Sequence, residues 1–140
     1  QHCHLVNRLR ARCEQIADVD CYVRQENPIA HPSSDSELEP DIAIVKGDLR
    51  DHGRAHPATA EFIIEVAIYS LELDREKGIV YAEAGVPEFW IVLPEEQAIE
   101  VYTSPSAEGY QQMRRHEDVN ALLVTTVFPE LSITPRELFA

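Results

Sequence analysis

Three segments of the chain carry the apolar spacing or the boundary residues of a helix. The first segment has apolar residues three or four positions apart, as on one helix face: Leu5, Leu9, Cys13 and Ile16. In the second, Ser70 is placed to cap the N-terminus and Gly85 to stop the C-terminus. In the third, Thr134 precedes Pro135, which suits a first helical turn. These signals predict helices over residues 2–17, 70–85 and 134–140.

Short apolar runs between polar stretches predict the strands. Residues 88–94 and 98–104 flank an acidic turn, which favours a β-hairpin. Residues 31–40 and 49–59 are polar and predict loops. Further strands are predicted at residues 21–28, 41–46, 60–68, 109–117 and 121–127. This order indicates an α/β (mixed α+β) fold with a central mixed β-sheet flanked by helices, and the length suits a single domain over residues 1–140.

One predicted strand contains a charge that its surroundings do not explain. In the stretch AEFIIEVAIYS, residues 60–70, apolar residues lie on both sides of Glu65. A carboxylate buried alone is costly, so Glu65 must be paired, protonated or bound to a metal ion.

The overall charge restricts the classes of partner. The formal net charge is −13, and 26% of the residues are charged. Such a surface repels nucleic acid unless basic residues gather locally or a cation neutralises the site. The charge therefore counts against a protein that simply coats DNA, but not against a metal-dependent enzyme, because carboxylates bind hard cations. No apolar run approaches the roughly 18 residues of a membrane span, so no membrane partner is expected.

The three cysteines are Cys3, Cys13 and Cys21, an odd number without paired spacing. This usage favours a reduced, cytoplasmic chain. The run His2-Cys3-His4 resembles a metal-binding cluster, but residues two apart do not share a helix face. We therefore expect free, buried thiols rather than a structural zinc site.

Two acids and a lysine form the candidate site. Asp41 opens one predicted strand, Glu65 lies inside the next, and Lys77 lies in the following helix. At about 100° per residue, Lys77 shares a helix face with other, mostly apolar residues, and its stem is expected to point toward the sheet. That predicted face consists of Leu73, Lys77, Val80, Tyr81 and Ala84.

These residue types suit phosphodiester hydrolysis. Two carboxylates on neighbouring strands can hold Mg²⁺, which lowers the pKa of a bound water and offsets phosphate charge. A nearby lysine can orient that water or stabilise charge in the transition state. Judged on spacing alone, a purely structural ion pair between Glu65 and Lys77 is an equally good explanation. Asp41 after Pro40 is also explained by a turn cap.

Four motifs carry a resemblance to a known family. They are EPD at residues 39–41, EVA..SL..DR.K at 65–77, YAEAGVPEFWIV at 81–92 and P.L.IT..ELF at 129–139. On these motifs the chain resembles the Uma-two family of restriction-endonuclease-like proteins, within the PD-(D/E)XK nuclease superfamily. The resemblance covers about residues 2–139 and implies the restriction-endonuclease-like core.

The resemblance implies roles for the candidate residues. Asp41 and Glu65 would be metal ligands for Mg²⁺ (or Mn²⁺). The superfamily lysine normally follows the acid by two positions, where this chain has Ala67, so the family pattern selects Lys77. The implied activity is metal-dependent cleavage of DNA. A homodimer is also expected, because a two-fold dimer cuts both strands of a duplex most easily. The alternatives are a catalytically weak or inactive binding or dimerisation module of the same fold, and a hydrolase acting on a smaller phosphate ester.

The chain also departs from the family pattern. It has Ile68-Tyr69 where members often have Asp-Ser, and Leu93 where an aspartate is usual. We expect a family segment before the first helix to be missing. His2 matches a family histidine and is expected either to cap that helix or to line the site, whereas Asp74 is expected to pair with Lys77 or assist the metal. Candidates for phosphate contact are Arg50, His52 and Arg54.

Overall fold

The computed structural model describes most of the chain, namely residues 2–15, 21–25, 29–30, 37–38, 40–46, 60–68, 71–129 and 131–139. The helices are α1 (His2–Glu14), α2 (Leu71–Glu83) and α3 (Pro135–Phe139). The strands are β1 (Cys21–Gln25), β2 (Ile29–Ala30), β3 (Glu37–Leu38), β4 (Ile42–Lys46), β5 (Phe62–Val66), β6 (Glu88–Leu93), β7 (Ala98–Ser106), β8 (Gly109–His116), β9 (Leu123–Val124) and β10 (Ser132–Ile133).

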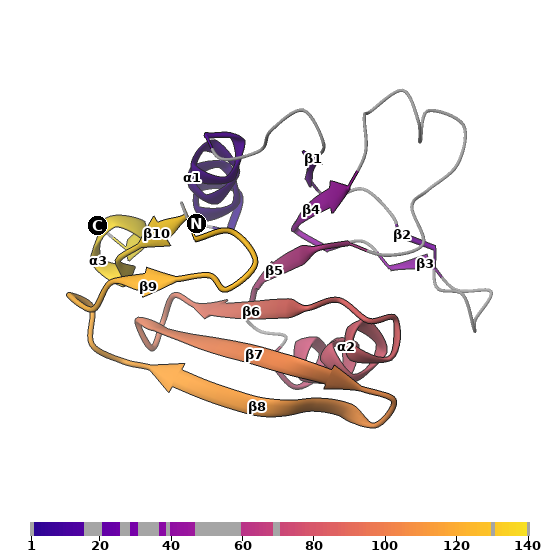
Figure 1. The fold of residues 1–140 in the computed structure, drawn as a ribbon. Coiled ribbons are helices and arrows are strands. Elements are labelled where there is room, and N and C mark those ends of the chain that lie inside the picture. The colour runs from indigo at the N-terminus through magenta and orange to yellow at the C-terminus, as the bar shows by residue number, and fades with distance from the viewer. Residues whose placement is uncertain are drawn as a thin grey trace.

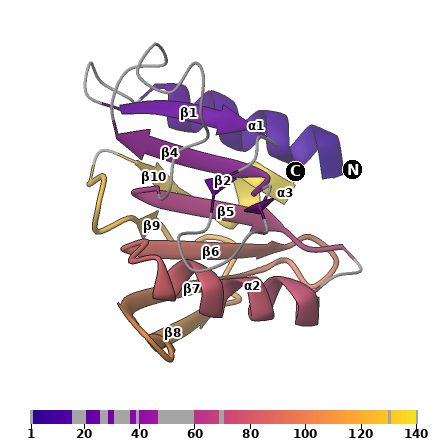
Figure 2. The same ribbon diagram turned by 90° about the vertical axis from the view of Figure 1, so that its right-hand side faces the viewer.

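Six of these strands form one mixed sheet in the order β1-β4-β5-β6-β7-β8. Strands β5 and β6 are parallel, and α2 is the crossover between them. The other neighbours in this sheet pair antiparallel. Helices α1 and α3 lie on one face of the sheet and α2 on the other, as Figures 1 and 2 show. The predicted fold, a central mixed sheet flanked by helices, is confirmed.

Each face of the sheet buries its own apolar core. On the α1 face the core includes Leu5, Leu9, Ile64, Trp90 and Ile99. On the α2 face it includes Ala43, Ile63, Tyr81, Phe89 and Ile91. Side chains alternate between the two faces along a strand, so Glu65 lies on the same face as Ile63. Glu65 therefore points toward α2.

The end of α2 is set by Gly85, as predicted. Its φ of 83° is a left-handed conformation that glycine adopts at low cost. The Gly85 N–H donates to the Ala82 carbonyl at 2.9 Å, and the Val86 N–H donates to the Tyr81 carbonyl at 3.0 Å. This pair of bonds is the Schellman arrangement, which satisfies carbonyls at the end of the helix. Ser70, the predicted N-cap, lies outside the described residues.

The predicted buried face of α2 is right for Tyr81 and for the direction of Lys77 but wrong for Leu73. Leu73 is 55% exposed, and the buried residues of the helix are instead Asp74, Gly78, Tyr81 and Ala82. Two contacts explain why the buried face has few large apolar residues. A Cβ added at Gly78 would lie 3.0 Å from the Phe89 ring, so β6 and α2 approach closely there. Asp74 is paired with Lys77, which lies at the edge of the buried face.

Two smaller predictions also need correction. The strand predicted over residues 121–127 is only β9, because the Thr125 side chain closes a turn directly after it. Its hydroxyl donates to the Phe128 carbonyl at 2.7 Å and accepts from the Phe128 N–H at 2.8 Å. The predicted loop 31–40 contains β3, which pairs with β2.

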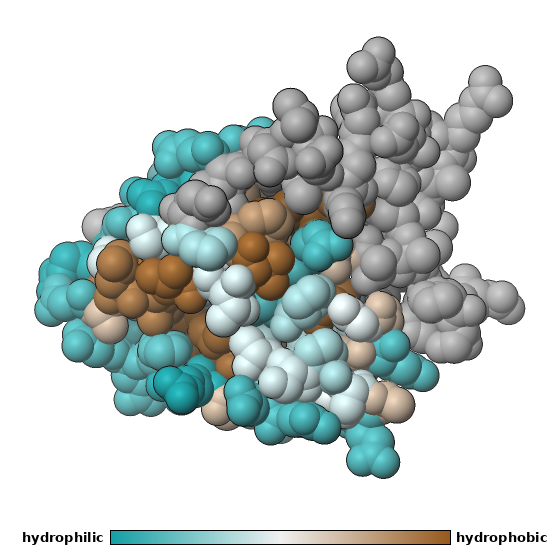
Figure 3. Space-filling model, viewed as in Figure 1, coloured by the Kyte–Doolittle hydropathy of each residue, from teal (hydrophilic) through white to brown (hydrophobic). Residues whose placement is uncertain are grey.

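The surface is not uniformly polar. Figure 3 shows apolar side chains gathered where β9 lies in Figure 1, and Leu122 and Val124 there are 61% and 50% exposed. Beside them a groove of about 340 Å³ runs along β6, β7 and β8, with Arg114 and His116 on its wall. None of the helices in the described part of the chain is long and apolar enough to cross a membrane.

Candidate functional site

The site begins where β4 and β5 run side by side. Ile42 pairs with Ile64 in the antiparallel register, so the next pair along the two chains is Asp41 and Glu65. Two backbone N–H groups donate to these carboxylates. The Asp41 N–H donates to Glu65 Oε1 at 2.8 Å, and the Val66 N–H donates to Asp41 Oδ2 at 2.7 Å. Both carboxylates are therefore held in place by backbone donors at the same edge of the sheet.

Helix α2 supplies the remaining groups of the site. Lys77 Nζ lies 3.2 Å from Glu65 Oε2 and 3.5 Å from Asp74 Oδ1. The Tyr81 hydroxyl donates to the same Glu65 Oε2 at 3.4 Å. Lys77 is 28% exposed at its side chain, whereas Glu65 is only 2% exposed. The structure thus brings together Asp41, Glu65 and Lys77, and it adds Asp74 and Tyr81.

The charge balance of this cluster is unusual. Burial, helped by the nearby Asp41 and Asp74 carboxylates, raises the pKa of Glu65 to about 7 against the lowering effect of Lys77. Burial lowers the pKa of Lys77, but the Glu65 and Asp74 carboxylates outweigh it, and the net pKa is raised. Lys77 is therefore charged, as predicted, although the second acid that holds it is Asp74. Burial beside Glu65 also raises the pKa of the Tyr81 hydroxyl.

The donor set fits a hard cation. The cluster holds three acids, Asp41, Glu65 and Asp74, but only one lysine, so a divalent cation at the carboxylates would offset the excess negative charge. Mg²⁺ commonly takes only one or two carboxylates and keeps several waters. Within the described residues no group of three or more His, Cys, Asp or Glu side chains has the geometry of a metal cage. A two-carboxylate, water-rich magnesium site is compatible with both observations.

Several predicted residues cannot be placed. Arg50, His52 and Arg54 lie outside the described residues, and so does the side chain of His2.

Cys13 is a buried free thiol, and burial raises its pKa to about 12.

Two of the residues that depart from the family pattern lie together. Ile68 and Leu93 line a hollow of about 510 Å³, together with Leu71, Leu73 and the acids Glu72, Glu95 and Glu96. It lies where β5 and β6 end and α2 begins. Apolar and acidic walls do not suit a phosphate.

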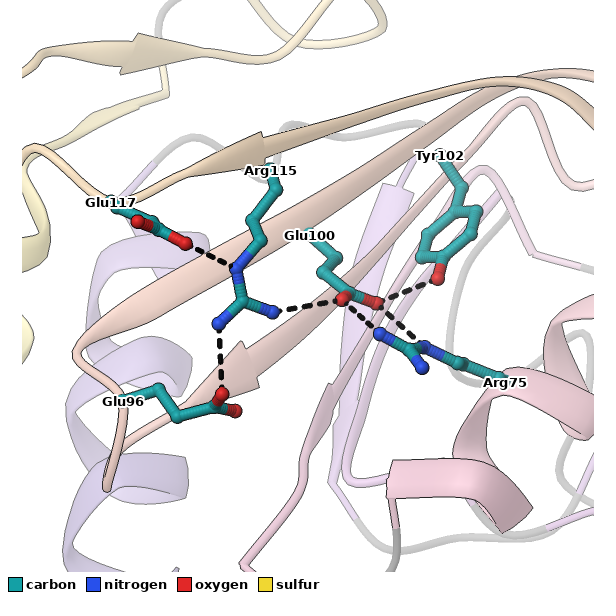
Figure 4. A network of polar contacts seen from close by, with 6 residues as sticks. All are labelled: Arg75, Glu96, Glu100, Tyr102, Arg115 and Glu117. Atoms are coloured by element: carbon teal, nitrogen blue, oxygen red, sulfur yellow. Dashed lines mark hydrogen bonds and ion pairs between the residues drawn. The ribbon is translucent and has the colours of Figure 1, made fainter.

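The sequence interpretation missed one site residue and one related network. The sequence pattern puts Tyr81 on the same helix face as Lys77 but indicates no role for it. Glu100, in the stretch AIEVY, is an acid in an apolar strand, which is the same signal that drew attention to Glu65. It is 0% exposed and accepts hydrogen bonds from Arg75, Tyr102 and Arg115. Figure 4 shows this network.

Comparison with known proteins decides the family. The family described as "Uma2: Putative restriction endonuclease" matches residues 1–136. The chain belongs to the Uma2 family. The predicted membership is thereby confirmed, and a nuclease-type chain is consistent with the fold. No curated protein matches the chain.

A solved structure supports the Uma2 fold independently. It is the crystal structure of a protein from Anabaena variabilis ATCC 29413, titled a "putative nuclease belonging to DUF820". The TM-score is 0.81 at 17% sequence identity, and the match covers 99% of the present chain and 79% of the other. At this identity the likeness shows the shared fold.

Proposed function

We propose that this Uma2 protein is a metal-dependent endonuclease that hydrolyses DNA phosphodiester bonds. Asp41 and Glu65 would bind Mg²⁺ or Mn²⁺, and Lys77 would act on the water or the phosphate. The observation that carries the proposal is the buried Glu65 carboxylate, which faces Asp41 and contacts the Lys77 amine at 3.2 Å. The family, a restriction endonuclease family by description, supplies the substrate class.

Each residue has a distinct part in this proposal. A bound Mg²⁺ supplies a water of lowered pKa and offsets the charge of the phosphate. The Val66 N–H holds Asp41, and the Asp41 N–H holds Glu65, so both ligands keep a fixed orientation. The Lys77 ammonium is a donor that can orient the water or stabilise charge that develops on the phosphate. The Tyr81 hydroxyl limits rotation of the Glu65 carboxylate.

The net charge of −13 bears on the proposal in two ways. DNA approaches such a surface only where cations are concentrated, and the metal and Lys77 provide them at the site. A homodimer is part of the proposal, because two sites related by a two-fold axis cut both strands of a duplex most simply.

The second candidate is a catalytically weak or inactive module that keeps the fold for binding or dimerisation. The acidic surface favours it, since a surface of this net charge repels nucleic acid. The apolar and acidic hollow at Ile68 and Leu93 points the same way. The paired acids favour the enzyme, because a scaffold has no need of a second carboxylate beside a buried one.

The test is a thermal melt with and without Mg²⁺. A ligand that binds only the folded state raises the melting temperature, so the wild-type protein should gain stability and Glu65→Gln should not. Glu76→Gln, on the exposed side of α2, is the matched control because it removes one charge away from the site. Equal gains in the wild type and Glu65→Gln would remove Glu65 as a ligand. A DNA-versus-nucleotide cleavage assay then separates an endonuclease from a hydrolase of small phosphate esters.

A further inference from the structure

Helix α2 is held by ion pairs along both of its sides. Arg75 and Lys77 are separated by about 200° around the helix axis, so they leave opposite edges of the buried face. That buried face is formed by Asp74, Gly78, Tyr81 and Ala82. Lys77 reaches Glu65 on β5, and Arg75 reaches Glu100 on β7. Strand β6 lies between these two strands in the sheet.

The two glutamates lie on one cross-strand row. Glu65 pairs with Ile91 of β6, and Ile91 pairs with Glu100 of β7. Paired residues share a face of the sheet, so both carboxylates rise toward α2 on either side of Ile91. The helix therefore spans β6 with one cationic side chain directed to each flanking strand.

The Arg75 contact is the more rigid of the two. Its guanidinium contacts both oxygens of Glu100, through Nε at 3.2 Å and Nη2 at 2.5 Å. A two-pronged contact fixes orientation as well as distance. The Tyr102 hydroxyl donates to Glu100 at 2.7 Å, and Arg115 Nη1 does so at 3.2 Å, so the carboxylate itself is also fixed (Figure 4). Lys77, by contrast, makes single contacts and is a flexible side chain.

We infer that the Arg75–Glu100 contact is a positioning device that sets the rotation of α2 and thereby holds Lys77 on Glu65. This inference rests on the role proposed above for Lys77. A rotation of about 20° about the helix axis moves a side-chain tip about 6 Å from that axis by roughly 2 Å. Such a shift is enough to break the Lys77 contact with Glu65. Gly78 against Phe89 sets how closely the helix approaches the sheet, but a glycine without a side chain does not set its rotation.

Arg115 provides a matched control within the same network. It contacts the same Glu100 carboxylate, but it belongs to β8, and its other ion pairs join Glu96 and Glu117. Removing Arg115 therefore weakens the network without releasing α2. Arg75→Met and Arg115→Met should both lower the melting temperature, and only the first should free Lys77.

The experiment measures the reactivity of the Lys77 amine. The chain has two lysines, Lys46 and Lys77, so a limiting amount of an acetylating reagent followed by mass spectrometry reports Lys77 relative to Lys46. We expect Arg75→Met to raise the relative acetylation of Lys77 several-fold and Arg115→Met to leave it at the wild-type level. Unchanged acetylation in Arg75→Met, or an equal rise in both variants, would overturn the inference.

Two further measurements keep the result decisive. If circular dichroism shows that Arg75→Met is unfolded, Arg75→Gln replaces it, since this variant keeps a hydrogen-bond donor for Glu100, loses the two-pronged contact and adds no lysine. Its Lys77 acetylation should exceed that of the wild type, and equality would overturn the inference. The DNA cleavage rate of Arg75→Met should fall by about the same factor as its relative acetylation of Lys77 rises. A wild-type protein that cuts no DNA would count against the proposed function, while the acetylation result would still judge the positioning role.

Discussion

Two buried glutamates on the same face of the sheet have opposite electrostatic environments. Glu65 and Glu100 flank Ile91 on one cross-strand row, and each contacts a basic residue of α2. Glu100 is surrounded by two arginines and a tyrosine. Their hydrogen bonds and charges outweigh the effect of burial and lower its pKa. Glu65 has one lysine, a long bond from Tyr81 and the neighbouring Asp41, and its pKa rises to about 7.

Under the function proposed above, this difference separates a structural acid, Glu100, from a metal ligand, Glu65. Both side chains have almost no surface open to solvent, so low exposure alone does not identify a site. What distinguishes Glu65 is that Lys77 alone does not balance the charge of Glu65 together with Asp41 and Asp74. A group left in that state costs stability, and groups with such perturbed pKa values are frequent at functional sites. Glu100 already accepts hydrogen bonds from Arg75, Tyr102 and Arg115, so it needs no ligand.

The largest expected effect is on catalysis by Glu65→Gln. Glutamine keeps the shape of the side chain but is a far weaker metal ligand, so Mg²⁺-dependent DNA cleavage should be abolished while the fold is kept. The measurement is cleavage of plasmid DNA over a range of Mg²⁺ concentrations, with Glu76→Gln as the charge-matched control. If Glu65→Gln cleaved DNA at the wild-type rate, Glu65 would have only a structural role, as Glu100 has.

Lys77→Met should lose most of the cleavage rate but still bind Mg²⁺. Methionine keeps an apolar stem and removes the charge that acts on the water or the phosphate. The rate should be measured at saturating Mg²⁺, because added metal would substitute for a lysine that only neutralises Glu65 and Asp74. Full recovery under those conditions would remove Lys77 from the mechanism and leave a metal-only site.

The pH dependence of stability should differ between the two glutamates. The pKa of Glu65 rises from 4.5 to about 7 on folding, so the metal-free folded state binds more protons in this window and stability falls as pH rises through it. The loss should total roughly 3 kcal/mol. Glu100 acts in the opposite sense, because its pKa is lowered and its contribution is lost only as pH falls below the ordinary glutamate range.

Urea unfolding in EDTA at pH 5 and pH 8 measures this effect. Between pH 5 and pH 8 the free energy of unfolding should fall more for the wild type than for Glu65→Gln, because the glutamine does not titrate. Identical pH dependence in the two proteins would show that Glu65 is neutralised as fully as Glu100.

The smallest effect is expected for Glu100→Gln, and it should fall on stability. The variant leaves two arginines without their shared carboxylate, but both side chains are partly exposed, at 44% and 28%, and water can replace part of the loss. We expect a loss of about 1–3 kcal/mol in the free energy of unfolding. The Mg²⁺-induced rise in melting temperature should persist, and its disappearance would contradict the separation of the two glutamates.

Much of the fold could be predicted from local signals. The hairpin of β6 and β7 consists of two apolar runs on either side of an acidic turn, and α2 ends at Gly85, which adopts the left-handed conformation that favours glycine. The buried face of α2 could not be predicted from apolar content, because its contacts are made by a glycine against Phe89 and by an aspartate paired with Lys77. Close approach and ion pairing depend on the neighbouring strand, which a local pattern does not contain.

The candidate site was predictable in part for a similar reason. Glu65 stood out as a charge within an apolar strand, and the family motifs pointed to Asp41 and Lys77. Glu100 gave the same local signal, yet only the structure shows that Arg75 and Arg115 complete it. Tyr81 reads as an ordinary apolar position of a helix until its hydroxyl is placed beside Glu65.

The central claim is that Asp41 and Glu65 form a metal site, and a crystal structure soaked with Mn²⁺ tests it most directly. The account predicts an anomalous peak within bonding distance of both carboxylates, at about 2.1–2.2 Å from their oxygens, with Lys77 still beside Glu65. It also predicts no peak at Glu100. The claim would be contradicted if the region between Asp41 and Glu65 stayed empty at saturating Mn²⁺ while Lys77 remained paired with Glu65.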